Sequence, residues 1–368
     1  MRIQTVASSL LLSAALTGCL GPAPSAPGGT DTSLYTDLPR TSTVSGYLID
    51  PEAFFVLSTE WPADPEDPEG PAPPLLVNGI PYFEFSSATG AQVSLVSGAA
   101  PQTDKASSGQ GGVWQLFNVP SSETTTYVLK AEPSAGGVRL GVGVPYPSAV
   151  TLPVSKYVPT ITLRPLVPSV PSCQFLVTTL TREDGALTAV ARRRTADGVA
   201  TTVADLTNPA KTAGVVLTWV FAPSFQLDWF QFPADQIKVT PGKGTIYPLE
   251  WKKPGTAGST QSPLGFIANK TGLSTIGYYA IVLPSNATGP LTLEFNDTTP
   301  AGGAPGPFGP RPWTFSKLVT PITPGVVSVA RVFASLGGDD GPPPADTDDE
   351  PTPVFPGQDF SRLCFPLE

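Results

Sequence analysis

The chain has 368 residues, a formal net charge of −9 and no histidine. Because lysine and arginine are outnumbered by acidic residues, we expect no basic surface for nucleic acid or for anionic lipid headgroups. The absence of histidine excludes Ser-His-Asp and Cys-His catalysis and histidine-ligated zinc. Carboxylates, lysines and tyrosines remain for any chemistry, and we expect neither a cofactor nor a metal site.

Residues 1–19 have the pattern of an export signal. Arg2 precedes an apolar run at residues 10–16 that is too short to span a bilayer as a helix. The run ends in Leu16-Thr17-Gly18-Cys19, which resembles the lipobox of bacterial lipoproteins. The resemblance implies a signal peptide at 1–18, a diacylglyceryl group and an N-acyl chain such as palmitate on Cys19, and anchoring to a membrane. An ordinary cleaved signal with a chance cysteine is the alternative.

The residues after Cys19 bear on its location. Leu20 is not the aspartate that commonly retains lipoproteins at the inner membrane, so resemblance to that sorting rule favours the outer membrane. Residues 19–42 are rich in proline, glycine, serine and threonine, which predicts a flexible tether. Periplasmic and surface-exposed orientations both stay open.

The composition predicts an all-β protein. Forty-five prolines and 36 glycines interrupt the chain too often for long helices, and short runs of β-branched and aromatic residues lie between them. We expect two β-sandwich domains of the transthyretin-like or immunoglobulin-like kind, at 43–165 and 172–336, divided by Pro165, Pro168 and Pro171.

The first domain carries motifs of a known family. Its strands are expected at 44–50, 82–85, 91–96, 113–117 and 126–131, with an acidic, proline-rich loop at 62–74. The motifs are Val44-Ser45-Gly46, Gly90-Ala91-Gln92-Val93-Ser94-Leu95, Thr103-Asp104, Gly112, Asn118-Val119-Pro120 and Tyr127-Val128-Leu129. They resemble the carboxypeptidase regulatory-like domain, a transthyretin-like sandwich. The resemblance implies a rigid accessory module without catalytic residues of its own.

The second domain is expected to be a β-sandwich throughout. Its strands are expected at 173–180, 215–221, 225–230, 237–240, 245–251, 264–268, 276–283, 291–295, 313–318 and 326–333. Asp197-Gly198 predicts a hairpin between 187–194 and 199–206. Strand alternation would then place Arg192 and Arg194 on one face, either as an anion-binding pair or as charges that protect a sheet edge.

Two of the three cysteines bear on the C-terminal tail. With Cys19 lipidated, Cys173 and Cys364 remain, and an oxidising compartment favours a disulfide between them. That bridge would pin the proline- and aspartate-rich tail at 337–368, which is otherwise expected to be solvated. Two unpaired buried cysteines, and an acidic interaction tail, are the alternatives.

Aromatic residues are most concentrated between 219 and 251. An exposed tryptophan beside an aspartate commonly holds a sugar ring, which makes Trp219, Trp229, Trp251 and Asp228 candidate ligand-binding residues. The alternative is that these rings fill the sandwich cores. Asp228 and Glu250 would serve a glycosidase only if the fold brought the two carboxylates together.

The sequence therefore favours a non-enzymatic lipoprotein of the cell envelope, acting as a structural or interaction module for a protein or polymer partner. A carbohydrate-binding lipoprotein is the first alternative, and a carboxylate-dependent hydrolase is the second. Solvent exposure of Trp229 or Trp251 would favour carbohydrate binding.

Overall fold

The computed structural model describes residues 41–53, 55, 86–97, 100–101, 105–120, 126–142, 154–166, 173–221, 233–303, 310 and 312–336. The chain divides into two compact units, residues 1–39 and 40–368, and the described residues belong to the second. The export signal, most of the tether, the tail, Cys19, Asp228, Trp229 and Cys364 lie outside the described residues. Among the described helices, none has both the length and the apolar character needed to cross a membrane.

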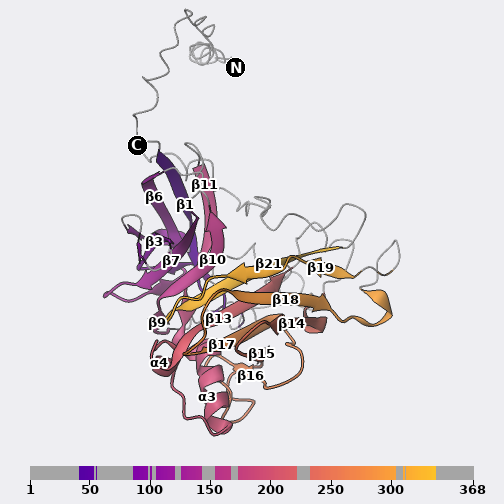
Figure 1. Ribbon diagram of the computed structural model, residues 1–368. Coiled ribbons are helices and arrows are strands. Elements are labelled where there is room, and N and C mark those ends of the chain that lie inside the picture. The colour runs from indigo at the N-terminus through magenta and orange to yellow at the C-terminus, as the bar shows by residue number, and fades with distance from the viewer. Residues whose placement is uncertain are drawn as a thin grey trace, which may run out of the picture. The chain divides into compact units, whose positions relative to one another are not determined.

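The expected all-β class is confirmed, and its main element is a long mixed sheet (Figure 1). Nine of its eleven strands follow the order β16-β15-β17-β13-β21-β10-β7-β3-β4, while β19 pairs with β21 and β5 pairs with β3. In that order, the nine strands are Phe266–Ala268, Thr245–Trp251, Tyr278–Pro284, Thr212–Phe221, Val327–Leu336, Thr160–Leu166, Tyr127–Pro133, Ala91–Ser97 and Ala100–Pro101. The two side strands are β19 (Trp313–Phe315) and β5 (Ala106–Ser107).

Two three-stranded sheets and two short strand pairs accompany it in the described part of the chain. The sheet β11-β1-β6 consists of Cys173–Thr179, Thr41–Ile49 and Val113–Pro120. The sheet β14-β18-β20 consists of Ile237–Pro241, Leu291–Asp297 and Leu318–Thr320. The pairs are β2 (Ala88–Thr89) with β8 (Arg139–Leu140), and β9 (Tyr157–Val158) with β12 (Thr181–Arg182).

Strands from both expected domains pair with one another. Strand β11 lies parallel to β1, and the central strand β21 lies parallel to both β13 and β10. Val327 of β21, for example, is opposite Val215 on one side and Thr160 on the other. Strands that precede and strands that follow the proline-rich segment, where we expected the domain boundary, therefore belong to the same sheets.

The described residues form three hydrophobic cores that pack against these sheets. Side chains of β13 alternate between two of them: Val215, Leu217 and Trp219 join one core, and Val216 and Val220 join the other. The first core is completed by the helical segment 186–191, and the second by β14 and β18.

The third core lies between sheet β11-β1-β6 and strands β3 and β7 of the long sheet, and includes Leu48, Trp114 and Leu129. Gly46 allows this packing. A Cβ atom at residue 46 would lie 1.7 Å from the carbonyl oxygen of Leu176 and 2.9 Å from the Trp114 ring.

The expected hairpin at 187–206 is wrong. The π-helical turn η3 (Glu183–Leu187) leads directly into α3 (Thr188–Ala196), and α4 (Val203–Leu206) follows. Leu187, Val190 and Ala191 have the i, i+3, i+4 spacing of a helix, and all three are buried. Gly198 follows the end of the helix and has a positive φ of 90°, a conformation that favours glycine. Asp-Gly therefore suits a helix C-terminus as well as a hairpin turn. The described residues also include three 3-10 turns: η2 (Gln110–Gly112), η4 (Ala234–Gln236) and η5 (Pro300–Gly302).

The expected placement of Arg192 and Arg194 on one face of a strand is also wrong, because both belong to α3. The three arginines of this helix have separate partners. Arg192 donates to the carbonyl of Gln261, and Arg193 forms an i, i+4 ion pair with Asp197 at 2.9 Å. Arg194 Nε donates to Thr201 Oγ1 at 3.2 Å.

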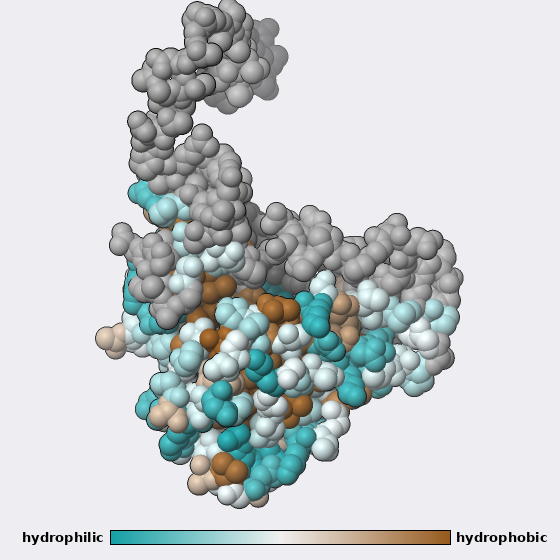
Figure 2. Space-filling model, in the orientation of Figure 1, coloured by the Kyte–Doolittle hydropathy of each residue, from teal (hydrophilic) through white to brown (hydrophobic). Residues whose placement is uncertain are grey.

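The visible surface mixes hydrophilic, neutral and hydrophobic residues (Figure 2). The large hydrophobic side chains that are exposed among the described residues are Phe117, Val154, Val199 and Val319. They belong to separate segments of the chain, and single exposed hydrophobic residues are ordinary on soluble proteins.

Candidate functional site

The described residues contain a buried cluster of ionisable side chains. Asp50 and Glu52 directly follow β1, and their exposed fractions are 0% and 1%. They face Arg182 of β12, which is also fully buried. Buried carboxylates and guanidinium groups are rare unless they are paired, so each partner needs to be identified.

Asp50 accepts four hydrogen bonds. Its Oδ2 accepts from the hydroxyl of Tyr157 at 2.8 Å and from a terminal guanidinium nitrogen of Arg182 at 3.1 Å. Its Oδ1 accepts from the backbone N–H groups of Glu52 and Ala53 at 3.0 and 3.1 Å. Asp50 thus organises the turn after β1 and joins it to β9 and β12.

Glu52 is held by two elements distant in sequence. Tyr278 of β17 donates its hydroxyl to Oε1 at 2.7 Å, and the backbone N–H of Ala186 donates to Oε2 at 3.0 Å. The carboxylate lies directly against Gly185, since a Cβ atom there would be 1.5 Å from Oε2. A side chain at residue 185 would therefore displace it.

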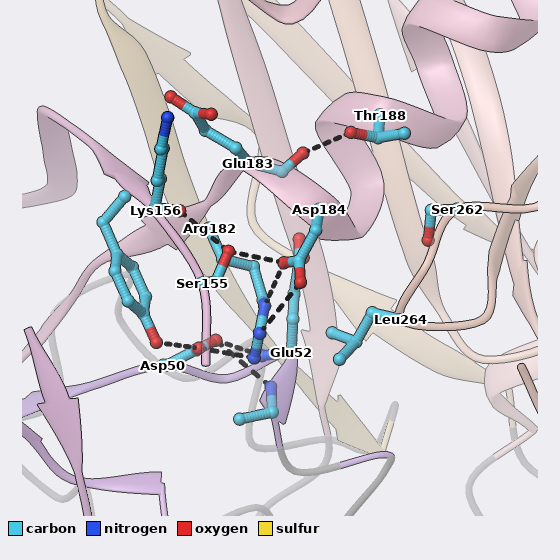
Figure 3. Close-up of polar contacts among 12 residues, drawn as sticks. Asp50, Glu52, Ser155, Lys156, Arg182, Glu183, Asp184, Thr188, Ser262 and Leu264 are labelled. Atoms are coloured by element: carbon cyan, nitrogen blue, oxygen red, sulfur yellow. Dashed lines mark hydrogen bonds and ion pairs between the residues drawn. The ribbon is translucent and has the colours of Figure 1, made fainter. Parts of the chain in front are cut away.

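Arg182 joins Asp50 to a third carboxylate, Asp184 (Figure 3). Its Nε donates to Asp184 Oδ1 at 2.6 Å, and a terminal nitrogen donates to Oδ2 at 3.2 Å, which is the two-pronged geometry that guanidinium favours. Ser155 also donates to Asp184 Oδ1, at 2.6 Å. Arg182 thereby bridges the turn after β1 and the turn η3.

Burial determines the protonation of the cluster. Desolvation and the nearby charge of Asp50 raise the pKa of Glu52 from 4.5 to about 8. Desolvation also raises the pKa of Asp50, against the opposing effect of Arg182. With Glu52 protonated at neutral pH, the cluster avoids one buried negative charge.

A carboxylic acid with such a pKa has the property required of a general acid, but catalysis also requires contact with substrate. Glu52 is almost fully buried, and both of its oxygens are hydrogen-bonded within the protein. In the described structure the cluster therefore holds the turn after β1 against β9, β12, β17 and η3.

Sequence reasoning missed this cluster. Asp50 was expected only as the last residue of the strand at 44–50, and Glu52 and Arg182 were not singled out. The available signal was two acidic residues immediately after an apolar strand. That signal does not identify the partner, because Tyr278 is 226 positions from Glu52.

The tryptophans expected to bind a ligand have different environments. Trp219 is 5% exposed, and its ring stacks on Tyr278 with centroids 3.6 Å apart, so it is a core residue. Trp251 is partly buried, and its indole N–H donates to the carbonyl of Leu264 at 2.9 Å. The structure brings Trp219 and Trp251 together through Phe55, which stacks on both.

The candidate hydrolytic carboxylate Glu250 is partly exposed. It accepts from the side-chain amide of Asn269 at 2.5 Å and lies 3.6 Å from the Lys252 ammonium. Its pairing with Asp228 stays a prediction, as does the Cys173–Cys364 disulfide, because one member of each pair lies outside the described residues. Within the described part of the chain, no three histidine, cysteine, aspartate or glutamate side chains gather as a metal site.

A buried amide shapes the loop between β15 and β16. Gln261 Nε2 donates to the carbonyls of Lys252 and Lys253 at 2.9 and 3.0 Å, and its Oε1 accepts from the backbone of Thr256 and Ala257, each at 3.1 Å. The loop containing residues 252–265 is therefore organised around one side chain.

Comparison with known proteins gives weak similarities. No protein-family model matches the sequence, and no curated protein matches it at a significant level. One similar solved structure is a family CBM26 carbohydrate-binding module of Eubacterium rectale Amy13K in complex with maltoheptaose, with 10% identity over 68% of this chain and 90% of that chain. Another is the shaft pilin SpaA of Lactobacillus rhamnosus GG, with 8% identity over 81% and 98%. Both TM-scores are 0.17, which does not establish a shared fold.

Proposed function

We propose that this chain is a non-enzymatic lipoprotein of the bacterial cell envelope. Cys19 carries the lipid anchor, and the all-β body contacts a protein or polymer partner. The outer membrane is the proposed location. The protein acts through its surface and uses no cofactor.

One observation carries the non-enzymatic part of the proposal. The described acidic residues with the most altered environment, Asp50 and Glu52, are buried, and every carboxylate oxygen of this pair accepts a hydrogen bond from the protein. Groups that are occupied in this way contribute to folding rather than to turnover. The extensive sheet structure gives such a protein a rigid body to present.

The location rests on the Leu16-Thr17-Gly18-Cys19 pattern and on Leu20. It can be tested by producing the full chain in a bacterial host supplied with an alkyne-bearing fatty acid. We expect the label on the wild-type protein and its loss in Cys19→Ser, which should also leave the membrane fraction. Cys173→Ser is the matched control and should keep the label. An unlabelled wild type, or a labelled Cys19→Ser, would contradict the anchor.

A polysaccharide is one kind of polymer partner, and Trp251 is the described candidate residue that favours it. Its ring is only partly buried, unlike that of Trp219. The full chain can be tested by affinity electrophoresis in gels that contain envelope or extracellular polysaccharides. Retardation that is lost in Trp251→Ala, but kept in the exposed-aromatic control Phe117→Ala, would favour carbohydrate binding. No retardation in any gel would favour a protein partner.

A further inference from the structure

Basic side chains gather around α3 and the edge strand β16. Residues 188–199 and 250–271 hold six of the chain's 21 lysines and arginines but only two of its 30 acidic residues. The six basic residues, which we call the basic rim, are Arg192, Arg193, Arg194, Lys252, Lys253 and Lys270. Figure 2 shows hydrophilic residues at the end of the molecule where Figure 1 places α3. The basic rim is therefore a local exception in a chain whose net charge is −9.

Contacts between the two segments bring the basic rim together. Arg192 of α3 donates to the carbonyl oxygen of Gln261, the residue around which the loop containing residues 252–265 is organised. On the other side of β16, the ammonium nitrogen of Lys270 lies 3.8 Å from Oδ2 of Asp197, which follows α3. The basic residues of the helix, the loop and the strand end therefore share one region of the surface.

The two acidic residues of this region position the basic rim without neutralising it. Asp197 lies between Arg193 and Lys270, with nitrogen–oxygen distances of 2.9 and 3.8 Å. Glu250 lies 3.6 Å from the Lys252 ammonium. Two carboxylates thus face six cations, so the region keeps a net positive charge.

Three cations of the basic rim have no carboxylate partner among the described residues, namely Arg192, Arg194 and Lys253. The two arginines donate to neutral oxygen atoms, the carbonyl of Gln261 and the hydroxyl of Thr201. Because a guanidinium carries five N–H groups, each arginine keeps donors for an anion. Lys253 is exposed. The charge that balances these three groups must come from solvent ions or from a ligand.

The surroundings of the basic rim favour a hydrated anionic polymer. Of the described large hydrophobic side chains that are exposed, Val199 alone lies in these two segments. Docking on a bilayer commonly inserts several apolar side chains, and binding of single-stranded nucleic acid uses exposed aromatic rings. The loop instead exposes small polar residues such as Ser259, which can form hydrogen bonds with sugar hydroxyls.

We propose that the basic rim binds an acidic polysaccharide whose repeating carboxylate groups pair with its lysines and arginines. The inference rests on the proposed function, since a lipoprotein of the cell envelope meets such polymers, and it names the partner that was left open there. Arginine takes a carboxylate in two-pronged geometry. Several exposed ion pairs act together along one polymer chain, so the binding is multivalent and sensitive to salt.

The test is surface plasmon resonance of the full chain, kept in a neutral detergent, over immobilised polygalacturonate. We expect saturable binding at about 50 mM salt that weakens at least about tenfold at about 500 mM, because salt screens exposed charges. Immobilised dextran, a neutral polysaccharide, should bind no protein. Absence of binding to polygalacturonate at the lower salt concentration would overturn the proposal, and so would equal binding to dextran.

Two triple variants locate the binding surface. The first replaces the lysines of the basic rim and consists of Lys252→Gln, Lys253→Gln and Lys270→Gln. It should bind about tenfold more weakly, because each exposed ion pair contributes a factor of about two to three. The matched control removes the same charge at exposed lysines of other segments and consists of Lys105→Gln, Lys238→Gln and Lys317→Gln. The control should stay within about twofold of the wild type, and equal weakening in both variants would contradict the basic rim.

Competition separates a polysaccharide from other anions. A single-stranded DNA oligonucleotide and micelles containing phosphatidylglycerol, each supplied at the same concentration of negative charge, should displace the protein less well than free polygalacturonate. Stronger displacement by either competitor would contradict the assignment to a polysaccharide. Failure of the basic rim would leave the fatty-acid label on Cys19 unchanged, so these experiments and the test of the lipid anchor fail independently.

Discussion

Gly185 leaves space for the carboxylate of Glu52. A Cβ atom at residue 185 would lie 1.5 Å from Oε2, a distance that no pair of non-bonded atoms can adopt. The N–H that holds this oxygen belongs to the next residue, Ala186, so the turn provides both the space and the donor. The packing of η3 and the position of Glu52 are therefore interdependent.

Gly185→Ala should destabilise the protein by about 2 to 4 kcal/mol, because Glu52 must leave its donors or the turn must shift. Urea unfolding followed by circular dichroism measures the change. Gly136→Ala is the control, since a Cβ atom there meets no neighbour closer than 3.9 Å. Equal stability of the two variants would show that residue 185 has more room than the contact distances indicate.

The free energy of unfolding should fall as the pH rises from about 4.5 to about 8. Glu52 titrates near its ordinary value of 4.5 in the unfolded chain and near 8 in the folded protein, so the folded state binds the extra proton between these limits. Each pKa unit corresponds to about 1.4 kcal/mol, so the fall should amount to several kcal/mol. Denaturation at pH 5, 7 and 8.5 measures it, and the slope should flatten in Glu52→Gln. A wild-type stability that rises over this range would contradict the assignment.

Arg182→Lys should cost about 3 to 5 kcal/mol despite conserving the charge. A lysine ammonium cannot form the two-pronged contact with Asp184 while also reaching Asp50, so a buried carboxylate loses its partner. Thermal unfolding should show a large decrease in Tm. Arg193→Lys is the surface control, because its ion pair with Asp197 is exposed and such pairs contribute about 0.5 kcal/mol.

Gln261→Ala should destabilise the loop between β15 and β16 by about 2 to 4 kcal/mol, because it leaves several backbone groups without their partner. Limited proteolysis should then cut within residues 252–265. Gln92→Ala, which removes one exposed hydrogen bond to Ser107, is the matched control and should resist cleavage. Cleavage that is equally slow in both variants would mean that the loop does not depend on Gln261.

Most strands could be predicted from the sequence because their short apolar runs end at turn residues. The expected strand at 215–221 lies within β13 (Thr212–Phe221), and the one at 291–295 lies within β18 (Leu291–Asp297). Local patterns of this kind depend on neighbouring residues only. These strands can therefore be recognised from the sequence alone.

Helix α3 could not be predicted by the same reasoning, because Asp197-Gly198 suits both a hairpin turn and a helix end. The spacing of Leu187, Val190 and Ala191 favours a helix, but only the hairpin signal was used for this segment.

The candidate site was beyond sequence reasoning for a different reason. Its contacts join Asp50 to Arg182 and Glu52 to Tyr278 across 132 and 226 positions. Nothing local distinguishes Arg182 from a solvated arginine. Arg182 is buried where β12 pairs with β9, and no local sequence pattern predicts that pairing.

The central position of β1 has a mechanical consequence. Strand β1 is hydrogen-bonded to β11 on one side and to β6 on the other, and in the sequence it directly follows the proposed tether. A pull on a lipid anchor at Cys19 would therefore load both ladders along their length and at the same time. Bonds loaded together in shear share the force, whereas bonds at a peeled edge break one after another. Tension from such an anchor would thus be shared between the two ladders of β1.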